Sequence, residues 1–358
     1  MIIFAHLLND RSGSPRVLKS VIEDLGFDEQ KRLYIGSDGD GILAAVEVDT
    51  RKFWYRRTPN RLLTMLTFCA SQVHLLWSLL CSPGIPRDAV VYVNTLLPFG
   101  AGLFGRLTNR PVIYHIHEMS LSPPALQRFL VAIARYTATR LIYVSDAHRT
   151  LLPIAPEKAV TVYNSIDVAL AEPSRDHVYR HRTGGVFTVL MLSYARSYKG
   201  ISELLSLARH FSNRKDIRFN LVVSDGGSLE QVEPSNLTLL PPTDNPEHQY
   251  AQASLVLNLS RPDLCVETFG LTLLEAMAFG IPVIAPPVGG PAELVTDGKE
   301  GLLIDSRNGA ALAAAVGQLA DDEARCLEMS AAARARAAQF GREDFRRGIL
   351  SVIEAVRG

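Results

Sequence analysis

At 358 residues the chain is longer than one ordinary hydrophobic core, and this length predicts two domains of roughly 150–200 residues each. Hydrophobic residues make up 47% of the sequence and charged residues 21%, which is typical of a soluble globular protein and excludes a disordered chain. Lys and Arg together number 37, as do Asp and Glu, so the overall charge gives no reason to expect a nucleic acid partner.

The cysteines and the N-terminus indicate the compartment. Four scattered cysteines show no metal-ligand spacing: Cys69, Cys81, Cys265 and Cys326. They are typical of reduced thiols in a cytosolic protein. The chain begins directly with an apolar stretch at 2–7, without the basic flank and cleavage site of a signal peptide. We therefore expect a cytoplasmic protein.

The first half of the chain alternates apolar, strand-like stretches with helical patterns. Strands are predicted at 2–8, 32–35, 89–94, 111–115, 141–144 and 160–163. This spacing favours parallel βα units in a doubly wound sheet, where ligands bind beyond the carboxyl ends of the strands. The polar residues that follow these strands are therefore candidates for a binding site.

Several candidates follow strands in this half. Gly13 lies in a turn after the first strand and would let the backbone approach a ligand closely. His115 and His117 share one face if the extended conformation continues past the strand. Two such histidines could suggest zinc, but no third ligand is evident, so a polar contact with a sugar or an acceptor is favoured. Asn164 follows the strand at 160–163.

Two neighbouring segments raise the question of a membrane. Residues 51–57 join cations to three aromatic residues, a pattern that fits either an anionic membrane surface or a solvated strand end. Residues 62–81 carry no formal charge over about the length that spans a bilayer. Their polar side chains favour a buried or surface-docked helix over a true span. Peripheral contact through 51–81 at the cytoplasmic face of a membrane therefore stays open.

A polar, basic segment at 171–185 interrupts the alternation and is typical of an interdomain linker. Beyond it, strands are predicted at 186–192, 219–223, 255–259 and 283–285, and a helical tail at 310–356. We therefore expect two similar α/β domains that face a cleft, covering residues 1–170 and 186–341.

The stretch 267–275 carries two carboxylates eight positions apart across a predicted loop-to-helix junction. Glu267 precedes the helix, whereas Glu275 lies among apolar residues, where a carboxylate is costly to bury unless paired. The backbone amides at this junction belong to Gly270, Leu271 and Thr272. A helix N-terminus is a ready anion site, and a ribose diol would pair well with Glu275. Together these features suit a nucleotide-sugar.

A diphosphate also needs cations. Arg196 offers a planar fork for two phosphate oxygens, and Lys199 offers a mobile point charge. Both follow the strand at 186–192. The glycines at 289–290 could wall the cleft or form a simple turn, and the turn is favoured.

These residues resemble the donor-site signature of the retaining glycosyltransferases of family 4, which have the GT-B architecture of two Rossmann-like domains facing a cleft. The resemblance covers the run 267–275 and the glycines at 289–290, and extends over nearly the whole chain. It implies that Glu267 holds hydroxyls of the donor sugar and that Glu275 binds the nucleotide ribose. Amides near Phe269 to Leu271 would contact the distal phosphate.

Other candidates match the family by position. Arg196 and Lys199 match its phosphate-binding residues, and His117 matches a histidine that contacts the transferred sugar. Three further donor-side residues match its glycine turns and the motif before the linker: Gly13, Gly226 and Asn164. The last helix, at 342–358, would pack back on the first domain.

The resemblance implies that a hexose-type sugar moves from a nucleotide-diphosphate sugar to a saccharide or lipid-linked saccharide. The expected setting is bacterial cell-surface polysaccharide or lipopolysaccharide synthesis, with no cofactor and no metal. No residue is clearly placed as a nucleophile, so we hypothesise front-face attack. Arg196, Lys199 and the helix amides would stabilise the leaving phosphate.

Two other classes of protein are alternatives to a glycosyltransferase. A non-catalytic nucleotide-sugar-binding subunit of a glycan-assembly complex would not need the acceptor-side residues Asn94, His117 and Glu118, whose presence argues against it. A nicotinamide-dependent oxidoreductase is not favoured, because no Gly-x-Gly-x-x-Gly motif follows the first strand.

Overall fold

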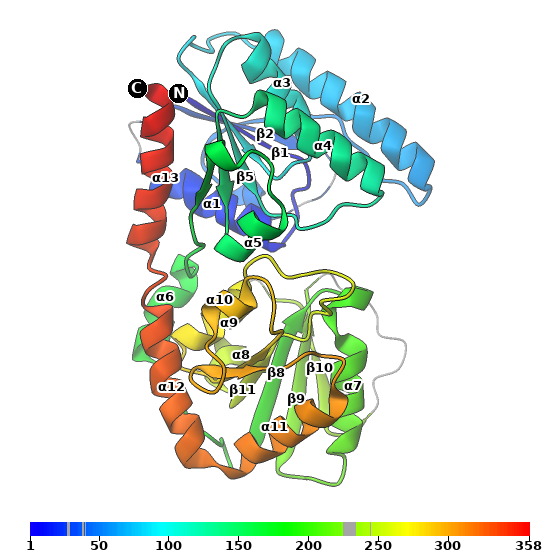
Figure 1. The fold of residues 1–358 in the computed structure, drawn as a ribbon, viewed down its shortest axis with the longest axis vertical. Coiled ribbons are helices and arrows are strands. Elements are labelled where there is room, and N and C mark those ends of the chain that lie inside the picture. Colours follow the sequence, from blue (N-terminus) through cyan, green and yellow to red (C-terminus); the bar gives the residue numbers. More distant parts are fainter. Residues whose placement is uncertain (27–28, 38, 40, 225–233, 244) are drawn as a thin grey trace. The chain divides into compact units, whose positions relative to one another are not determined.

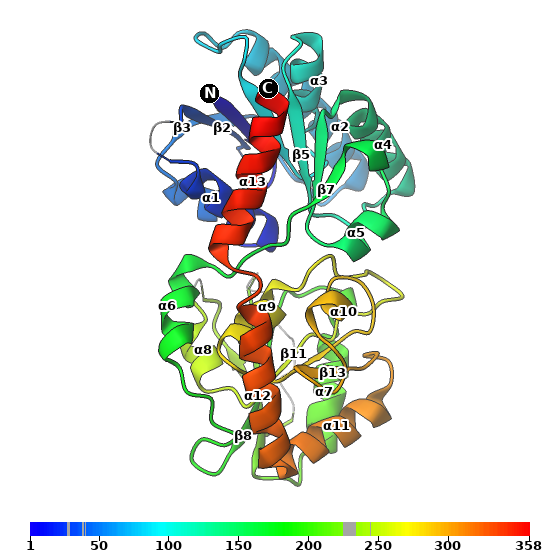
Figure 2. The ribbon, with the colours of Figure 1, turned by 60° about the vertical axis from the view of Figure 1, so that its left-hand side comes forward.

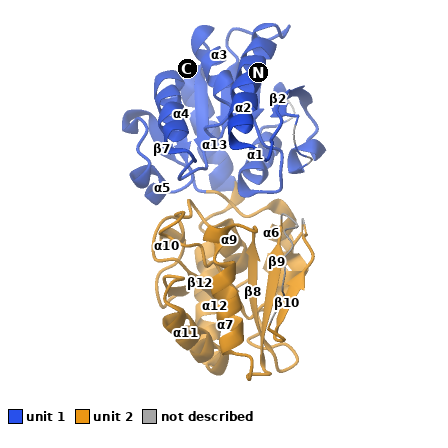
Figure 3. Cartoon of the chain, turned by 90° about the vertical axis from the view of Figure 1, so that its right-hand side faces the viewer, with its two compact units in different colours: residues 1–163, 343–358 blue, residues 164–342 orange. Residues whose placement is uncertain are grey.

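The computed structural model describes residues 1–26, 29–37, 39, 41–224, 234–243 and 245–358. The chain forms two compact units, one of residues 1–163 with 343–358 and one of residues 164–342 (Figure 3). Each unit contains one parallel sheet with helices packed against it (Figure 1). The predicted fold class of two doubly wound, Rossmann-like α/β domains is confirmed.

The sheet of unit 1 has the strand order β3-β2-β1-β4-β5-β6-β7. Its strands are β1 (Ile2–His6), β2 (Lys31–Gly36), β3 (Asp49–Phe53), β4 (Val90–Asn94), β5 (Val112–Ile116), β6 (Arg140–Tyr143) and β7 (Ala159–Thr161). All neighbouring pairs are parallel. The order therefore reverses between β1 and β4, and the carboxyl ends of β1, β4 and β5 lie next to one another.

The edge strand β3 of this sheet was not predicted. β3 exposes its first four residues and buries only Phe53, so it lacks the apolar pattern that marks the inner strands. Charged side chains on an edge strand are a common protection against pairing with other chains, and they also remove the hydrophobic signal from the sequence.

The helices of unit 1 are α1 (Gly13–Asp24), α2 (Arg61–Leu80), α3 (Phe99–Leu107), α4 (Pro124–Thr137), α5 (Asp146–Leu151) and α13 (Arg342–Arg357), with 3-10 turns η1 (Ile42–Ala45) and η2 (Pro156–Lys158). α13 lies beside α1, where Arg346 donates to the carbonyl of Asp24 at 3.1 Å (Figures 1 and 2). Arg357 at its end binds both carboxylate oxygens of Glu29.

The sheet of unit 2 has the order β10-β9-β8-β11-β12-β13. Its strands are β8 (Phe187–Ser193), β9 (Ile217–Val223), β10 (Leu237–Leu240), β11 (Leu255–Leu257), β12 (Val283–Ala285) and β13 (Gly301–Leu303). Its helices are α6 (Val168–Asp176), α7 (Ile201–His210), α8 (Glu247–Ala251), α9 (Leu271–Ala278), α10 (Pro291–Leu294), α11 (Gly309–Asp321) and α12 (Glu323–Ala337), with a 3-10 turn η3 (Ser197–Lys199).

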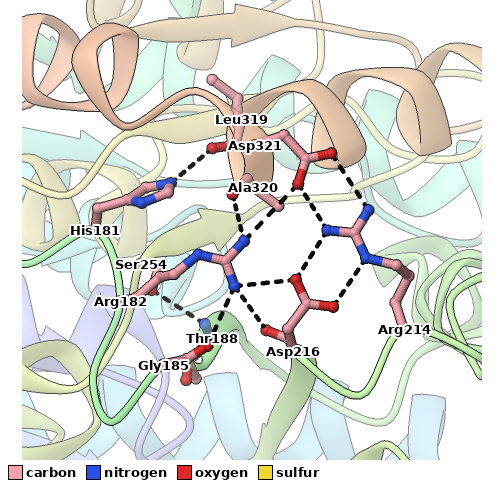
Figure 4. A network of polar contacts seen from close by, with 10 residues as sticks. All are labelled: His181, Arg182, Gly185, Thr188, Arg214, Asp216, Ser254, Leu319, Ala320 and Asp321. Carbon is pink, nitrogen blue, oxygen red and sulfur yellow. Dashed lines mark hydrogen bonds and ion pairs between the residues drawn. The ribbon is translucent and has the colours of Figure 1, made fainter.

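The segment 171–185 belongs to unit 2 rather than forming a separate linker, and the units divide at Asn164. Arg182 donates to Asp216 at 3.0 Å and to the carbonyl of Ala320 at 2.6 Å (Figure 4). The buried His181 lies 2.9 Å from the carbonyl of Leu319. The polar side chains that suggested a linker therefore bind residues far along the chain. Composition alone does not reveal these contacts.

Candidate functional site

An ion pair lies at the carboxyl edge of the unit 2 sheet. Lys199 ends η3, after β8, and Glu267 lies in the loop between β11 and α9. Lys199 Nζ is 2.6 Å from Glu267 Oε2, and the Ser260 hydroxyl donates to the same oxygen at 3.1 Å. The two charged side chains keep 22% and 20% of their surface exposed, so a ligand can still reach them.

Both members of this pair are held in their charged forms. Burial alone disfavours either charge, but their mutual attraction and hydrogen bonds outweigh it. The pKa of Glu267 therefore lies below its ordinary value, and the pKa of Lys199 lies above its own. Lys199 thus brings a permanent positive charge to this edge of the sheet.

The start of α9 lies directly after Glu267 in the chain. Gly270 has φ 104° and is the N-cap residue of α9, so the N-cap itself offers no side chain to the first amides. The first amides of a helix have no partner within the helix, so those of Leu271 and Thr272 carry the positive end of the helix dipole. Phe269 is buried against Phe340, with 6.0 Å between the ring centroids, and anchors the loop.

Gly289 and Gly290 pack against the backbone of this loop. Gly290 donates its amide to the carbonyl of Glu267 at 3.0 Å, and Gly289 has φ 74°. A Cβ on Gly289 would collide with the Glu267 carbonyl, and one on Gly290 would collide with the Cα of Phe269. The favoured interpretation of 289–290 as a turn therefore gains a reason: only residues without a side chain let the turn pack on the loop.

Gly290→Ala should destabilise the protein by about 1–3 kcal/mol, because the added methyl forces the Glu267–Phe269 backbone to move. Urea unfolding measures this. Gly309→Ala is the matched control, since a Cβ there meets nothing within 4 Å. Equal stability of the two variants would contradict the packing argument.

Glu275 is buried in α9, only 4% exposed. Its Oε2 accepts a 2.6 Å hydrogen bond from the hydroxyl of Tyr250, which comes from α8. The sequence pattern indicated that this carboxylate needs a partner but gave no sign of Tyr250. A ribose contact of Glu275 stays a prediction.

For the remaining candidates the structure gives a position but does not test the proposed contact with the donor. Arg196 is exposed beside η3 and donates to the carbonyl of Ala195 at 3.2 Å, so its phosphate contact stays a prediction. Asn164 is 3% exposed, and its Oδ1 has no hydrogen-bond partner among the described residues. Gly226 lies outside the described residues. Gly13 begins α1 and, like His117, belongs to unit 1.

In unit 1 the neighbouring ends of β1, β4 and β5 bring three polar residues together. Asn94 lies at the centre: its Nδ2 is 3.1 Å from His6 Nδ1, and its Oδ1 is 3.0 Å from His117 Nε2. Its Nδ2 also donates to the carbonyl of Ser14 at 3.1 Å. Asn94 is therefore fully engaged by this cluster.

These contacts assign the proton of His117. Because Asn94 Nδ2 donates to a carbonyl, Asn94 Oδ1 must be the acceptor that faces His117, so His117 Nε2 carries the hydrogen. Burial, followed by the nearby His115, His148 and His6, holds the pKa of His117 well below its usual value. His117 is thus a neutral imidazole whose Nδ1 has its lone pair available to accept from a hydroxyl.

His115 and His117 lie on one face, as the alternation predicted, with ring centroids 4.3 Å apart. His115 Nδ1 is 2.7 Å from the Tyr92 hydroxyl. The Glu118 carboxylate accepts from the amides of Leu96 and His117, yet burial keeps its pKa above the ordinary value. Among the described residues, no group of three or more His, Cys, Asp or Glu is placed to hold a metal ion.

Sequence reasoning missed three residues that shape these sites. Ser260 follows β11, so the rule that strand ends carry ligands could have found it. His6 ends a strand and reads as part of an apolar run. Tyr250 offered no signal, because its role depends on how α8 packs beside α9.

Residues 180–336 match the family model described as "Glycosyl transferases group 1". The D-inositol 3-phosphate glycosyltransferase 1 of Catenulispora acidiphila is 30% identical over 297 residues, which cover 72% of this chain and 70% of that protein. The match to the D-inositol 3-phosphate glycosyltransferase of Acidothermus cellulolyticus is 30% identical but spans only 48% of that protein and 55% of this chain.

Solved structures share the fold over the whole chain. A crystal structure of Anabaena Alr3699/HepE in complex with UDP and glucose has a TM-score of 0.77 at 20% identity, covering 99% of both chains. A sucrose-phosphate synthase from Thermosynechococcus elongatus has a TM-score of 0.75 at 17% identity, also covering 99% of both. At these identities the likeness shows the fold.

Proposed function

Because the chain belongs to the group 1 glycosyltransferases and has the two-domain GT-B fold, we propose that it moves a hexose-type sugar from a nucleotide-diphosphate sugar to a saccharide or lipid-linked saccharide. The observation that carries the proposal is the Lys199–Glu267 pair beside the start of α9, whose N-cap is Gly270. A cation and helix amides suit a diphosphate, and a partly exposed carboxylate suits sugar hydroxyls.

The proposed reaction retains the configuration of the sugar, as in family 4. The bond between the anomeric carbon and the diphosphate oxygen breaks, and its electron pair leaves with the diphosphate. Lys199, the amides of Leu271 and Thr272, and in this proposal Arg196, stabilise the growing negative charge. The acceptor hydroxyl attacks from the same face, and its proton passes to the leaving phosphate oxygen, so atoms and charge balance.

His117 is proposed to orient the sugar. Its Nε2–H is engaged by Asn94, and its Nδ1 can accept a hydrogen bond from a sugar hydroxyl. Because burial and the neighbouring histidines keep its pKa low, His117 stays uncharged at neutral pH and adds no charge near the reacting sugar. This assignment makes His117 a hydrogen-bond acceptor rather than a general acid.

The reaction is proposed to need no metal and no cofactor, because Lys199 and the helix amides already supply positive charge for the leaving group. The proposed setting is bacterial cell-surface polysaccharide or lipopolysaccharide synthesis in the cytoplasm. Support for this setting comes from the resemblance to family 4. Turnover that is lost in excess chelator and restored by Mg²⁺ or Mn²⁺ would contradict the metal-independent part.

The first test is a thermal-shift screen against UDP, GDP and ADP, followed by transfer assays with the matching sugar donors. UDP is the first choice, because the structural relative Alr3699/HepE was solved with UDP and with UDP-glucose. Stabilisation by one nucleotide together with slow donor hydrolysis or transfer supports the proposal. Stabilisation with neither reaction would instead indicate a nucleotide-sugar-binding subunit.

Glu267→Gln should lower kcat/KM for the sugar donor by about a hundredfold, while the affinity for the free nucleotide diphosphate changes little. Glu267 is assigned to sugar hydroxyls, which the free nucleotide diphosphate lacks, and the amide oxygen of Gln can still accept from Lys199 and keep it in place. Calorimetry with the diphosphate and steady-state kinetics with the donor measure the two effects. Glu323→Gln, at an exposed carboxylate of α12, is the control. Equal losses for donor and free nucleotide would assign Glu267 to the diphosphate instead.

A further inference from the structure

Helix α2 in unit 1 presents an apolar stripe outward. Four large side chains form it: Leu62, Leu66, Val73 and Trp77, which are 79%, 67%, 69% and 66% exposed. At 100° per residue these positions fall within a narrow sector of the helix surface, so they form one continuous line. Cys69, which lies between them on the same side, is also exposed. Soluble proteins rarely expose a continuous apolar line along a helix of 20 residues, and such a surface usually marks an interaction site.

The opposite side of α2 is fixed to unit 1. Phe68 meets Phe99 of α3 with ring centroids 5.8 Å apart, and Gln72 accepts from the Gly100 amide at 3.1 Å. By length and composition α2 could cross a membrane, and 28% of its most apolar window is buried. A span would break these polar and aromatic contacts. The packing therefore favours a helix that stays in the fold with its outer face uncovered.

Cations occur in the segment before α2 and at the first residue of the helix. The segment before α2 runs back along the helix, since the Trp54 amide donates to His74 Nδ1 at 2.9 Å and Thr67 donates to the Arg56 carbonyl at 2.7 Å. Besides Arg51, which pairs with Asp49 at 3.0 Å, the exposed cations of this region are Lys52, Arg56, Arg57 and Arg61. No Asp or Glu occurs anywhere between 50 and 87. The region is therefore both apolar and positively charged, although the whole chain is neutral.

We propose that this surface, named the α2 face and made of Leu62, Leu66, Val73 and Trp77 with the four cations beside them, docks on an anionic lipid bilayer. α2 would lie parallel to the membrane plane, with its apolar stripe in the acyl boundary and its cations among the headgroups. Charge complementarity selects this occupant, because a stretch of sequence that carries several cations and no Asp or Glu matches a negatively charged leaflet. The proposal is independent of the sugar-transfer reaction.

The protein carries its own reporter for this surface. The chain has two tryptophans, Trp54 and Trp77, and both are exposed beside or on the α2 face. Vesicles of phosphatidylcholine mixed with phosphatidylglycerol should shift the tryptophan emission to shorter wavelength, because the indole rings leave water. Vesicles of phosphatidylcholine alone should give a much smaller shift, and added salt should weaken binding to the anionic vesicles.

Two double variants separate charge from apolar contact in vesicle co-sedimentation. Arg56→Gln with Arg57→Gln should weaken binding to anionic vesicles by about 25-fold, at about fivefold for each cation. Leu66→Ser with Trp77→Ser should weaken binding to both kinds of vesicle by at least about tenfold. The matched control is Val178→Ser with Leu264→Ser in unit 2, which changes two exposed apolar residues and should bind as the parent protein does.

All of these positions are exposed, so the variants should unfold at the same temperature as the parent protein. A change in vesicle binding can then be assigned to the surface rather than to unfolding. Transfer to a water-soluble acceptor should also be unchanged, which separates this proposal from the proposed function. Absence of binding to anionic vesicles, or equal binding by every variant, overturns the proposal. A dimer in solution that the Leu66→Ser, Trp77→Ser variant dissociates, without vesicle binding, assigns the α2 face to a second copy instead.

Discussion

Lys199→Ala should lower kcat at saturating donor by about a hundred- to a thousandfold. The lysine brings a permanent charge to the edge where the diphosphate is proposed to leave, and Glu267 keeps that lysine charged and in place. Charge that develops only as the bond breaks is stabilised in the transition state more than in the bound donor. The loss should therefore appear in kcat as well as in kcat/KM.

The same change removes the partner of a largely buried carboxylate. Loss of Lys199 takes away the charge that lowers the pKa of Glu267, so burial should then raise that pKa. We expect a loss of stability on the order of 1–3 kcal/mol, below the range for fully buried pairs because both side chains are about one-fifth exposed. Urea unfolding measures this change separately from turnover.

A double variant separates the two effects. Lys199→Met with Glu267→Gln leaves no unpaired charge, so most of the stability should return while turnover stays low. Lys215→Ala, at an exposed lysine of the same unit, controls for loss of a positive charge and should leave kcat unchanged. Near-normal turnover of Lys199→Ala with saturating donor would rule out the electrostatic account.

In unit 2 the sequence predicted the local structure of the junction at 267–275 well, because that information is local. The junction at 267–275 carries its own signals, namely an apolar helix, a preceding glycine and two carboxylates, and the structure places Gly270 at the start of α9 as expected. Lys199 and Glu267 were both predicted for one donor site, but a direct contact between them was not predicted. Their direct contact joins residues 68 positions apart, and only the β8-β11 strand order brings them together.

The cluster of His6, Asn94 and His117 in unit 1 was even harder to predict, because it depends on the order of the strands. His117 was predicted from its position after a strand, but the bond network through Asn94 to His6 requires β1, β4 and β5 to be neighbours. An alternation of strands and helices predicts that a parallel sheet forms but does not order its strands. The segment 171–185 shows the converse error: its polar side chains bond distant carbonyls, which composition cannot distinguish from solvation.

The stability of unit 1 should fall steeply as the pH decreases from 7 to 5. Four histidines near the carboxyl edge of its sheet are largely buried in the neutral form: His6, His115, His117 and His148. Burial is the largest cause in each case, and it lowers the pKa of His115 to about 3 and of His148 to about 4. The pKa values of His6 and His117 are lowered too.

The direction follows from proton binding. An unfolded histidine has a pKa of about 6.5 and takes up a proton below it, whereas the folded cluster does not until the pH is far lower. The unfolded state therefore binds more protons, and the stability present above pH 6.5 is lost as the pH falls toward the folded values near 3–4. Each histidine contributes about 1 kcal/mol per pH unit in this window. Glu118 offsets part of the loss, because its raised pKa favours proton uptake by the folded state.

Tryptophan fluorescence makes the measurement specific, because Trp54 and Trp77 both belong to unit 1. Urea unfolding followed by this signal at pH 7, 6 and 5 gives the slope of stability against pH. His115→Asn should reduce that slope by at most about 1.4 kcal/mol per pH unit, because asparagine cannot be protonated and unfolding then takes up about one proton fewer. His210→Gln, at an exposed histidine of unit 2, should leave the slope as it is. A flat profile between pH 7 and 5, or a slope that His115→Asn does not change, would show that the cluster already accepts protons in the folded protein.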